Sequence, residues 1–384
     1  MNVSTSPHTN RTVPLCYSIN SPPFNYNLTI ASAYFSSIFS GLGLTSNLIA
    51  FVVLLKSFQR AHSLSRSSFL IFLCGLVVTD FMGLLVTGSI VVSFHITHFN
   101  WRDLDAHCHF CNFMGMSMVF YGLCPLLLGA SMAVERFVGI NRPFARSASM
   151  PKRRAVSMVL MVWTFAGCVS LLPLGGLGSY HIQMPGSWCF FNISSLGTDM
   201  VFSLLFSLVG LLSITVSFVL NTVSVVTLIK VCCGQDRMQR RRDYEVEMMV
   251  QLILIMVIAS ICWCPFLVFI AQTVLSGSRL QIRLLLLWLR FVTWNQILDP
   301  WVYILFRRAV LKRIYPRFDW SRGSIMTLYP SFSGTIRRFT RSSLGTATCS
   351  SLDHCRLLVF TPNWATMKTE STVKNPRGAF FVSL

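Results

Sequence analysis

Acidic residues are scarce in this chain of 384 residues, which has 13 Asp and Glu against 32 Lys and Arg. Charged residues make up 12% of the sequence. Soluble globular proteins have about 25% charged residues, so this composition excludes an ordinary soluble enzyme. Hydrophobic residues make up 53%, and the mean hydropathy is +0.60, which excludes a disordered chain. The composition indicates a bundle embedded in a membrane.

Residues 1–27 contain no apolar run of the signal-peptide type, so the first helix is expected to act as the targeting signal. The sequence does contain seven long segments with almost no charge. The shortest has 23 residues, which as a helix would span about 34 Å and cross a hydrocarbon core of about 30 Å. The seven segments are residues 31–55, 67–94, 110–134, 155–177, 200–229, 248–275 and 284–306.

Each segment is expected to be an α-helix, because in lipid the backbone polar groups must bond within their own segment. The predicted fold class is therefore all-α, a bundle of seven transmembrane helices. Pro125, Pro173, Pro265 and Pro300 are expected to kink these helices rather than end them. The expected regions are an extracellular tail (1–30), the transmembrane bundle (31–306), an amphipathic membrane-surface helix (307–316) and a disordered cytoplasmic tail (317–384).

The basic residues predict the orientation. Of the 32 Lys and Arg, 27 lie in the loops and tail on one side of the predicted bundle and 4 on the other. Lys and Arg concentrate on the cytoplasmic side, so the N-terminus is expected outside and the C-terminus inside, and the expected location is the plasma membrane, as the family resemblance given below implies. This distribution also explains the net charge of +19 without a nucleic-acid partner. Four glycosylation sequons fall on the external side: Asn2, Asn10, Asn27 and Asn192.

Four of the 13 cysteines lie on the predicted external side, where disulfides persist. Four cysteines allow three different pairings, and the sequence alone leaves all three open. The four are Cys16, Cys108, Cys111 and Cys189.

Few charged residues lie within the predicted helices. A charge near the bilayer centre costs several kcal/mol, so each is expected to face the interior of the bundle. Asp80 and Asp299 fit either a buried packing network or a conformational switch. Glu135 and Arg136 are expected at the inner end of the third helix.

Arg290 lies nine residues outward of Asp299 in the seventh helix, about 14 Å at helical rise. The sequence places no acidic residue at that depth in another helix. Since an arginine cannot deprotonate in a protein, an anion from outside the chain is expected, and a guanidinium suits a carboxylate or a phosphate. The alternative is that Arg290 extends toward the outer headgroups.

These features leave two classes of function open. One is a ligand-gated receptor, and the other is an organic-anion transporter or channel that binds its substrate at Arg290. None of the eight histidines lies deep in a predicted helix, which argues against an intramembrane enzyme. No fixed spacing of histidines indicates a metal site, so no metal or cofactor is expected.

Short motifs in six of the seven predicted helices point to one family. They are Asn47, Asp80, Glu135-Arg136-Phe137, Trp163, Cys262-Trp263-Cys264-Pro265 and Asp299-Pro300-Trp301-Val302-Tyr303. Together they resemble the rhodopsin-like G-protein-coupled receptors. Two further segments, 185–190 and 289–300, are similar to those of prostanoid receptors, most of all to those that bind thromboxane A2. The resemblance covers residues 30–315.

This resemblance implies a lipid ligand with one carboxylate, thromboxane A2 or prostaglandin H2. It also implies coupling to calcium-mobilising (Gq-class) heterotrimeric G proteins, and contact of the surface helix with membrane lipids. Arrestin and receptor kinases are expected partners of the tail. The implied ligand-contacting residues are Arg290 for the carboxylate, His95 near it, Ser187, Trp188 and Phe190 in a covering loop, and Thr87 and Val91 in an apolar slot. For His95, a solvated position at the rim is the alternative.

The resemblance pairs Cys111 with Cys189, which leaves Cys16 to pair with Cys108. Pro125 stands where many relatives have a serine that helps to hold sodium, so a sodium ion at Asp80 and a proton shared with Asp299 both stay open. The residues implied in the conformational switch are Asp80, Glu135, Arg136, Trp263, Pro265, Asp299 and Tyr303.

Overall fold

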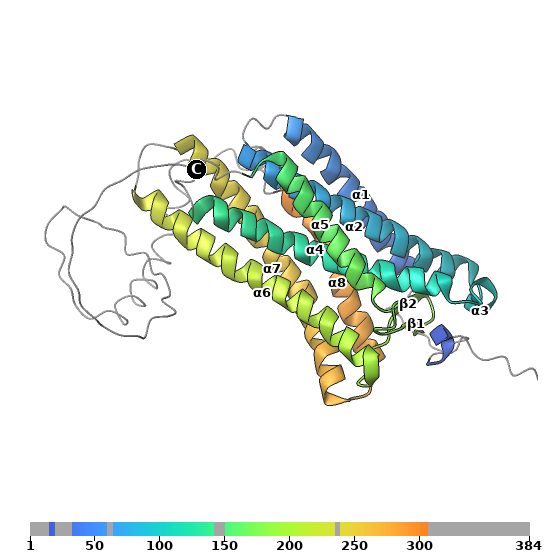
Figure 1. The fold of residues 1–384 in the computed structure, drawn as a ribbon. Helices are drawn as coiled ribbons and strands as arrows, with labels where there is room; N and C mark the ends of the chain where they lie inside the picture. Colours follow the sequence, from blue (N-terminus) through green and yellow to red (C-terminus); the bar gives the residue numbers. More distant parts are fainter. Residues whose placement is uncertain (1–14, 20–32, 60–63, 142–149, 235–238, 306–384) are drawn as a thin grey trace, which may run out of the picture. The chain divides into compact units, whose positions relative to one another are not determined.

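Long α-helices form most of the protein, as the sequence predicts. The computed structural model describes residues 15–19, 33–59, 64–141, 150–234 and 239–305, all within one compact unit, Met1–Ser321. Seven long helices lie in these ranges (Figure 1). They are α1 (Ala33–Gln59), α2 (Leu64–Thr97), α4 (His109–Asn141), α5 (Lys152–Leu171), α6 (Gly197–Gly234), α7 (Gln239–Ser276) and α8 (Ile282–Leu305).

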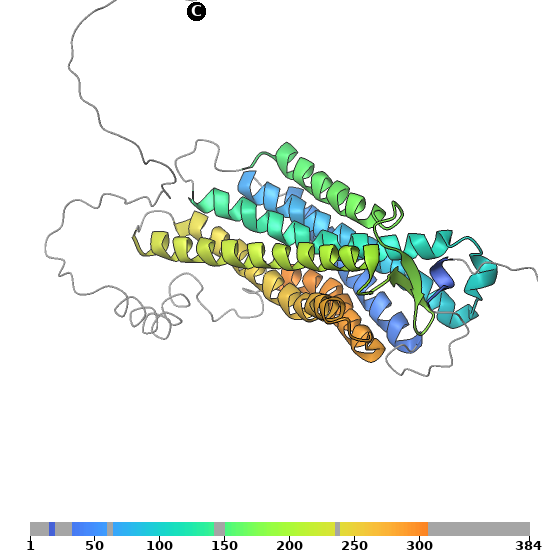
Figure 2. The ribbon, with the colours of Figure 1, turned by 60° about the horizontal axis from the view of Figure 1, so that its bottom comes forward.

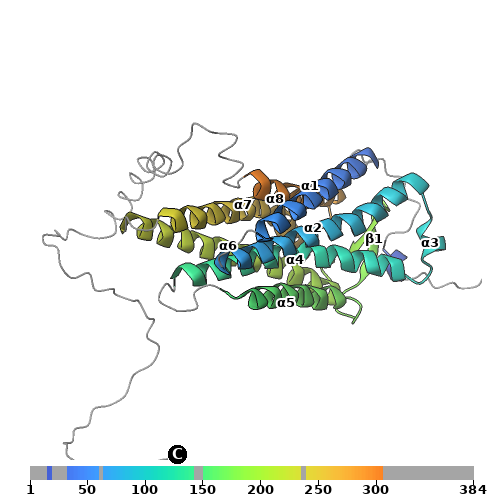
Figure 3. The same cartoon turned by 90° about the horizontal axis from the view of Figure 1, so that it is seen from above.

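Four short elements lie at the same end of the long helices. We call this end the hairpin end. They are η1 (Leu15–Tyr17), α3 (Trp101–Leu104), β1 (Tyr180–Gln183) and β2 (Trp188–Phe191). The two strands pair antiparallel, with Tyr180 opposite Phe191 and Gln183 opposite Trp188. Figures 1 and 3 show the strand pair and α3 at the same end of the helices, and Figure 2 shows η1 beside the strands, which it contacts.

Six of the long helices in the described ranges are long and apolar enough to cross a membrane, and α8 is the exception. Polar residues lower the hydropathy of α8, since it carries Arg290, Asn295, Gln296 and Asp299. Asn295 and Asp299 are each only 1% exposed, so the polar side chains of this helix face other helices. Its low hydropathy therefore reflects an interior polar face.

One expectation about the helices is wrong. Pro173 ends its helix instead of kinking it, because α5 stops at Leu171 and the chain then turns. Pro173 has no N–H to continue the backbone hydrogen bonds of the helix, although Leu172 before it is still in helical conformation. Gly176, at a φ of +94°, continues the turn. Pro125, Pro265 and Pro300 lie inside their helices, as expected.

Two groups of buried side chains hold the helices together. One, at the hairpin end, includes Trp101, Phe190 and Trp263, and the other includes Phe72 and Tyr303. Close approach of α4 and α7 in the first group depends on a glycine, because a Cβ at Gly122 would lie 3.0 Å from the Trp263 ring. Small residues of this kind let membrane helices pack closely. The surface helix expected at 307–316 lies outside the described residues.

Candidate ligand-binding and switch sites

Arg290 is half-buried on α8, near the start of α1. Its guanidinium carbon lies 4.2 Å from the centroid of the Phe35 ring, and its Nη2 donates to Ser36 Oγ at 3.4 Å. Phe35 and Ser36 could not be predicted as neighbours of Arg290, because nothing in an apolar helix marks which of its residues face a residue of another helix. These two contacts direct the guanidinium toward α1.

His95, expected near the carboxylate, lies close enough to Arg290 to interact with it electrostatically. It is half-buried, and in the described part of the chain its Nε2 has no hydrogen-bond partner. Val91 packs against the hydrophobic group that contains Phe190, whereas the Thr87 hydroxyl donates to its own helix at Gly83 O. The structure thus brings a cation and an imidazole together at the hairpin end.

The residues expected in a covering loop lie in and next to β2 and are deeply buried. Ser187 and Trp188 are each 3% exposed, and Phe190 is 2% exposed. The Phe190 ring lies 6.0 Å from that of Phe206 on α6 and 6.2 Å from that of Phe266 on α7. The segment that contains Ser187, Trp188 and Phe190 is therefore packed between helices and does not lie on the surface.

Both disulfides that the resemblance implied are present. Cys111 on α4 bonds Cys189 on β2, and Cys16 in η1 bonds Cys108, with Cα–Cα distances of 5.4 Å and 5.9 Å. Tyr17 adds a second anchor for η1, since its hydroxyl lies 2.9 Å and 3.0 Å from two backbone oxygens near α3. Burial raises the pKa of Tyr17 to about 12, so its hydroxyl remains a hydrogen-bond donor even in alkaline solution near pH 10.

A polar network that the sequence did not reveal fastens the strands to α6. Ser179 Oγ donates to Asp199 Oδ1 and lies 2.8 Å from His181 Nε2, and Asn192 Nδ2 donates to Asp199 Oδ2 at 2.7 Å. Burial lowers the pKa of His181, an effect that Asp199 partly offsets. The nitrogen that would carry a glycan at Asn192 is thus engaged in this network, while the sequons at Asn2, Asn10 and Asn27 lie outside the described residues.

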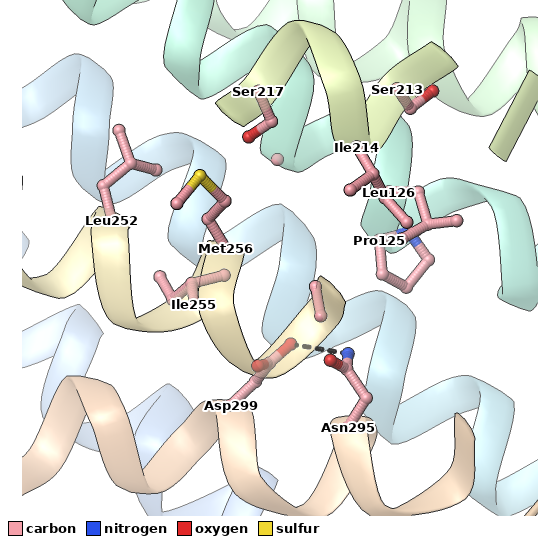
Figure 4. A pocket seen from close by; sticks show the side chains of 12 residues that line it. Pro125, Leu126, Ser213, Ile214, Ser217, Leu252, Ile255, Met256, Asn295 and Asp299 are labelled. Carbon is pink, nitrogen blue, oxygen red and sulfur yellow. Dashed lines mark hydrogen bonds between the residues drawn. The ribbon is translucent and has the colours of Figure 1, made fainter. Parts of the chain in front are cut away.

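Asp80 and Asp299 lie deep in the bundle and interact electrostatically. Asp80 is fully buried, and Asp299 accepts a hydrogen bond from Asn295 at 3.0 Å. Figure 4 shows Asn295 and Asp299 at a cavity of about 20 Å³, whose opposite wall includes Ser213 and Ser217 of α6. That volume holds about one water molecule. None of the expected ligand-contacting residues lines this cavity.

Two other expected switch residues, Trp263 and Tyr303, are also buried, at 1% and 3% exposed. The Trp263 ring lies 6.0 Å from that of Phe266, which directly follows Pro265 on α7. Phe266 in turn neighbours Phe190 of β2. Aromatic contacts therefore connect Phe190 of β2, through Phe266, with Trp263 in the proline-containing turn of α7.

Glu135 and Arg136, near the end of α4 opposite the strands, form a salt bridge and are each 6% exposed. Ser68 of α2 donates to Glu135 Oε1 at 2.9 Å. Arg136 lies over the Phe69 ring at 5.3 Å and donates to the sulfur of Met248 on α7 at 3.4 Å. Helices α2 and α7 therefore cover Arg136 in this conformation.

Comparison with known proteins agrees with this geometry. A family model described as "7 transmembrane receptor (rhodopsin family)" matches residues 46–303. The thromboxane A2 receptors of Bos taurus and Homo sapiens are 56% and 54% identical over 315 residues, which is 79% of this chain and 91% of each relative. The prostaglandin F2-alpha receptor of Homo sapiens is 41% identical over 288 residues, 74% of this chain and 80% of the relative.

The crystal structure of squid rhodopsin has a similar fold, with a TM-score of 0.58 at 19% identity. The similarity covers 77% of this chain and 90% of that one. The extent of the family match and the identity to prostanoid receptors agree with the motifs on α4, α7 and α8. The chain therefore belongs to the rhodopsin family of seven-transmembrane G-protein-coupled receptors, among its prostanoid receptors, and is a multi-pass protein of the plasma membrane and not an enzyme.

Proposed function

We propose that this receptor binds thromboxane A2 through a carboxylate held by Arg290 and signals through Gq-class G proteins. The observation that carries the proposal is the position of Arg290, a half-buried cation at the hairpin end within electrostatic range of His95. A guanidinium donates two parallel hydrogen bonds to a carboxylate, and His95 adds a further donor. The identity to thromboxane A2 receptors, 54–56% against 41% for a prostaglandin F2-alpha receptor, favours thromboxane A2 over other prostanoids.

The remaining ligand-contacting residues follow from the same proposal. Trp188 and Phe190 close the site from the side of the strands, and Val91 supplies apolar surface from α2. Prostaglandin H2 presents a similar chain and the same carboxylate, so it is the alternative ligand. Arrestin, receptor kinases and anionic lipids are proposed as partners of the C-terminal region, whose residues 306–384 lie outside the described part of the chain.

Calcium release in cells that express the receptor tests both halves of the proposal. A panel of prostanoids should give the strongest response with a thromboxane A2 analogue, and a Gq inhibitor should abolish that response. A stronger response to another prostanoid would contradict the ligand, and a response that persists with Gq blocked would contradict the coupling.

An organic-anion transporter, the other class that the sequence leaves open, gains no support from the comparisons. Binding measurements in membranes separate it from a receptor, because a receptor is coupled to its G protein and a transporter is not. GTP should lower the affinity of an agonist for the receptor. Affinity that is insensitive to GTP, together with uptake of the labelled ligand, would favour the transporter.

The Glu135→Gln variant should raise signalling in the absence of ligand. Glu135 holds Arg136 in the covered conformation, where α7 contacts it through Met248. Removing the charge weakens this pairing by about 0.5–1.5 kcal/mol and should raise the active-to-inactive ratio about 2- to 12-fold. Inositol phosphate accumulation at matched surface expression measures the effect.

Arg136→Ala should have the opposite effect on signalling. It should abolish signalling, while the affinity for an antagonist stays unchanged. The Ser68→Ala variant is a graded control, since it removes the hydrogen bond from Ser68 to Glu135 and keeps the salt bridge between Glu135 and Arg136. Its basal signalling should fall between the parent and Glu135→Gln. Unchanged basal signalling in Glu135→Gln, with full signalling in Arg136→Ala, would mean that the pair only anchors α4.

A further inference from the structure

Two residues of α1 fix the orientation of the Arg290 guanidinium. The guanidinium carbon lies over the Phe35 ring, 4.2 Å from its centroid, and Ser36 accepts a hydrogen bond from Nη2 at 3.4 Å. A guanidinium stacks on an aromatic ring face to face, so its N–H groups point sideways in its own plane. Because Ser36 is only 5% exposed, this contact lies inside the bundle and is not a surface encounter.

Phe35 is itself held in place by an aromatic stack, defined as Phe35, Phe39 and Trp294. The first two rings are stacked with centroids 4.0 Å apart, and the Trp294 ring lies 5.3 Å from that of Phe39. Residues four apart share one face of a helix, so Phe35 and Phe39 line one face of α1, as Arg290 and Trp294 line one face of α8. The stack therefore joins the two helices over two successive turns.

The backbones of α1 and α8 also lie close together further along. Asn47 Nδ2 donates to the backbone oxygen of Gln296 at 2.9 Å. A Cβ at Gly43 would lie 2.5 Å from the Leu84 side chain of α2 and 3.2 Å from the Ile297 side chain of α8, so a larger residue would force these side chains to shift. This packing sets the distance from α1 to α8 and hence the distance from Phe35 to Arg290.

We propose that Phe35 and Ser36 are positioning residues for Arg290 and determine how strongly the receptor prefers a carboxylate to its neutral ester. This inference rests on the proposed function, in which Arg290 binds the ligand carboxylate. Binding costs less when a flexible side chain is ordered before the ligand arrives. A carboxylate meets the edge of a guanidinium and Phe35 occupies its face, so the two contacts are compatible.

The test compares a radiolabelled prostaglandin endoperoxide analogue, which has a free carboxylate, with its methyl ester as a competitor in membranes. Phe35→Leu keeps an apolar side chain but removes the aromatic face. We expect it to lower the affinity for the carboxylate about 2- to 30-fold, the range of a cation–π contact, and to leave the affinity for the ester unchanged. Phe35→Tyr retains the aromatic face and should restore the preference for the carboxylate.

Phe51→Leu is the matched control, since it makes the same change on the same helix among the hydrophobic residues away from Arg290. It should leave both affinities unchanged at equal surface expression. If Phe35→Leu behaves like this control, lowers both affinities equally, or raises the affinity for the carboxylate, the positioning role is wrong.

Arg290→Gln separates failure of this inference from failure of the proposed function. With Arg290 replaced, Phe35→Leu should have no further effect, because the two residues act through one interaction. If Arg290→Gln lowers carboxylate affinity while Phe35→Leu does not, only the positioning role is wrong. If Arg290→Gln itself has no effect, the carboxylate site lies elsewhere and both proposals are wrong.

Discussion

The Arg290→Gln receptor should reach the cell surface in normal amount and lose high-affinity binding of carboxylate ligands. Glutamine keeps a hydrogen-bond donor but removes the charge. A hydrogen bond to a charged group contributes about 1.5–3 kcal/mol or more. Losing it should lower the affinity about 10- to 150-fold. Saturation binding with a radiolabelled prostanoid carboxylate, normalised to surface expression, measures this change.

Two controls make the result specific to the charge of Arg290. Arg283→Gln makes the same substitution on the same helix at an exposed position, and it should leave the affinity unchanged. The methyl ester of the ligand should bind the parent receptor as weakly as it binds Arg290→Gln, since esterification removes the other charge of the pair. Unchanged carboxylate affinity in Arg290→Gln at normal surface level would reject the binding role.

Some residues of the site could be predicted from the sequence because their side chains are charged. Asp80, Arg290 and Asp299 stand out because ionisable residues are costly in a membrane and rarely occur there without a function. Phe35 and Ser36 carry no such signal, since an aromatic residue and a serine in a transmembrane helix are ordinary. Their contact with Arg290 depends on how α1 packs against α8, which a single sequence does not specify.

Hydropathy predicted which segments cross the membrane, but it predicted the ends of the helices less well. α7 begins at Gln239, nine residues before the predicted segment starts at Met248, because charged residues continue a helix beyond the lipid. α5 ends early at Leu171, two residues before Pro173, whose missing N–H outweighs the apolar residues around it. The strands β1 and β2 were not predicted, since each has only four residues and both are buried throughout, so that neither gives a periodic pattern long enough to recognise.

The two disulfides should differ in their effect on the receptor. Replacing both Cys111 and Cys189 by alanine should cost about 2–5 kcal/mol of stability, the usual range for a native disulfide. Both residues are fully buried, and the bond ties β2 to the first turn of α4. Loss of this bond should allow β2, which carries Phe190, to move. It should lower both the yield of folded receptor and the affinity of the receptor for ligand.

Replacing Cys16 and Cys108 by alanine makes the same chemical change at the other bridge and should be milder. Tyr17 still anchors η1, because it is 1% exposed and its hydroxyl keeps its contacts with the oxygens of Trp101 and Asp105. Yield and thermal inactivation of ligand binding should therefore change less than in the first variant. Peptide mapping without reductant should confirm that each variant retains the other bridge. Equal losses in the two variants would show that η1 matters as much as the strands, and the ranking of the two bridges would be wrong.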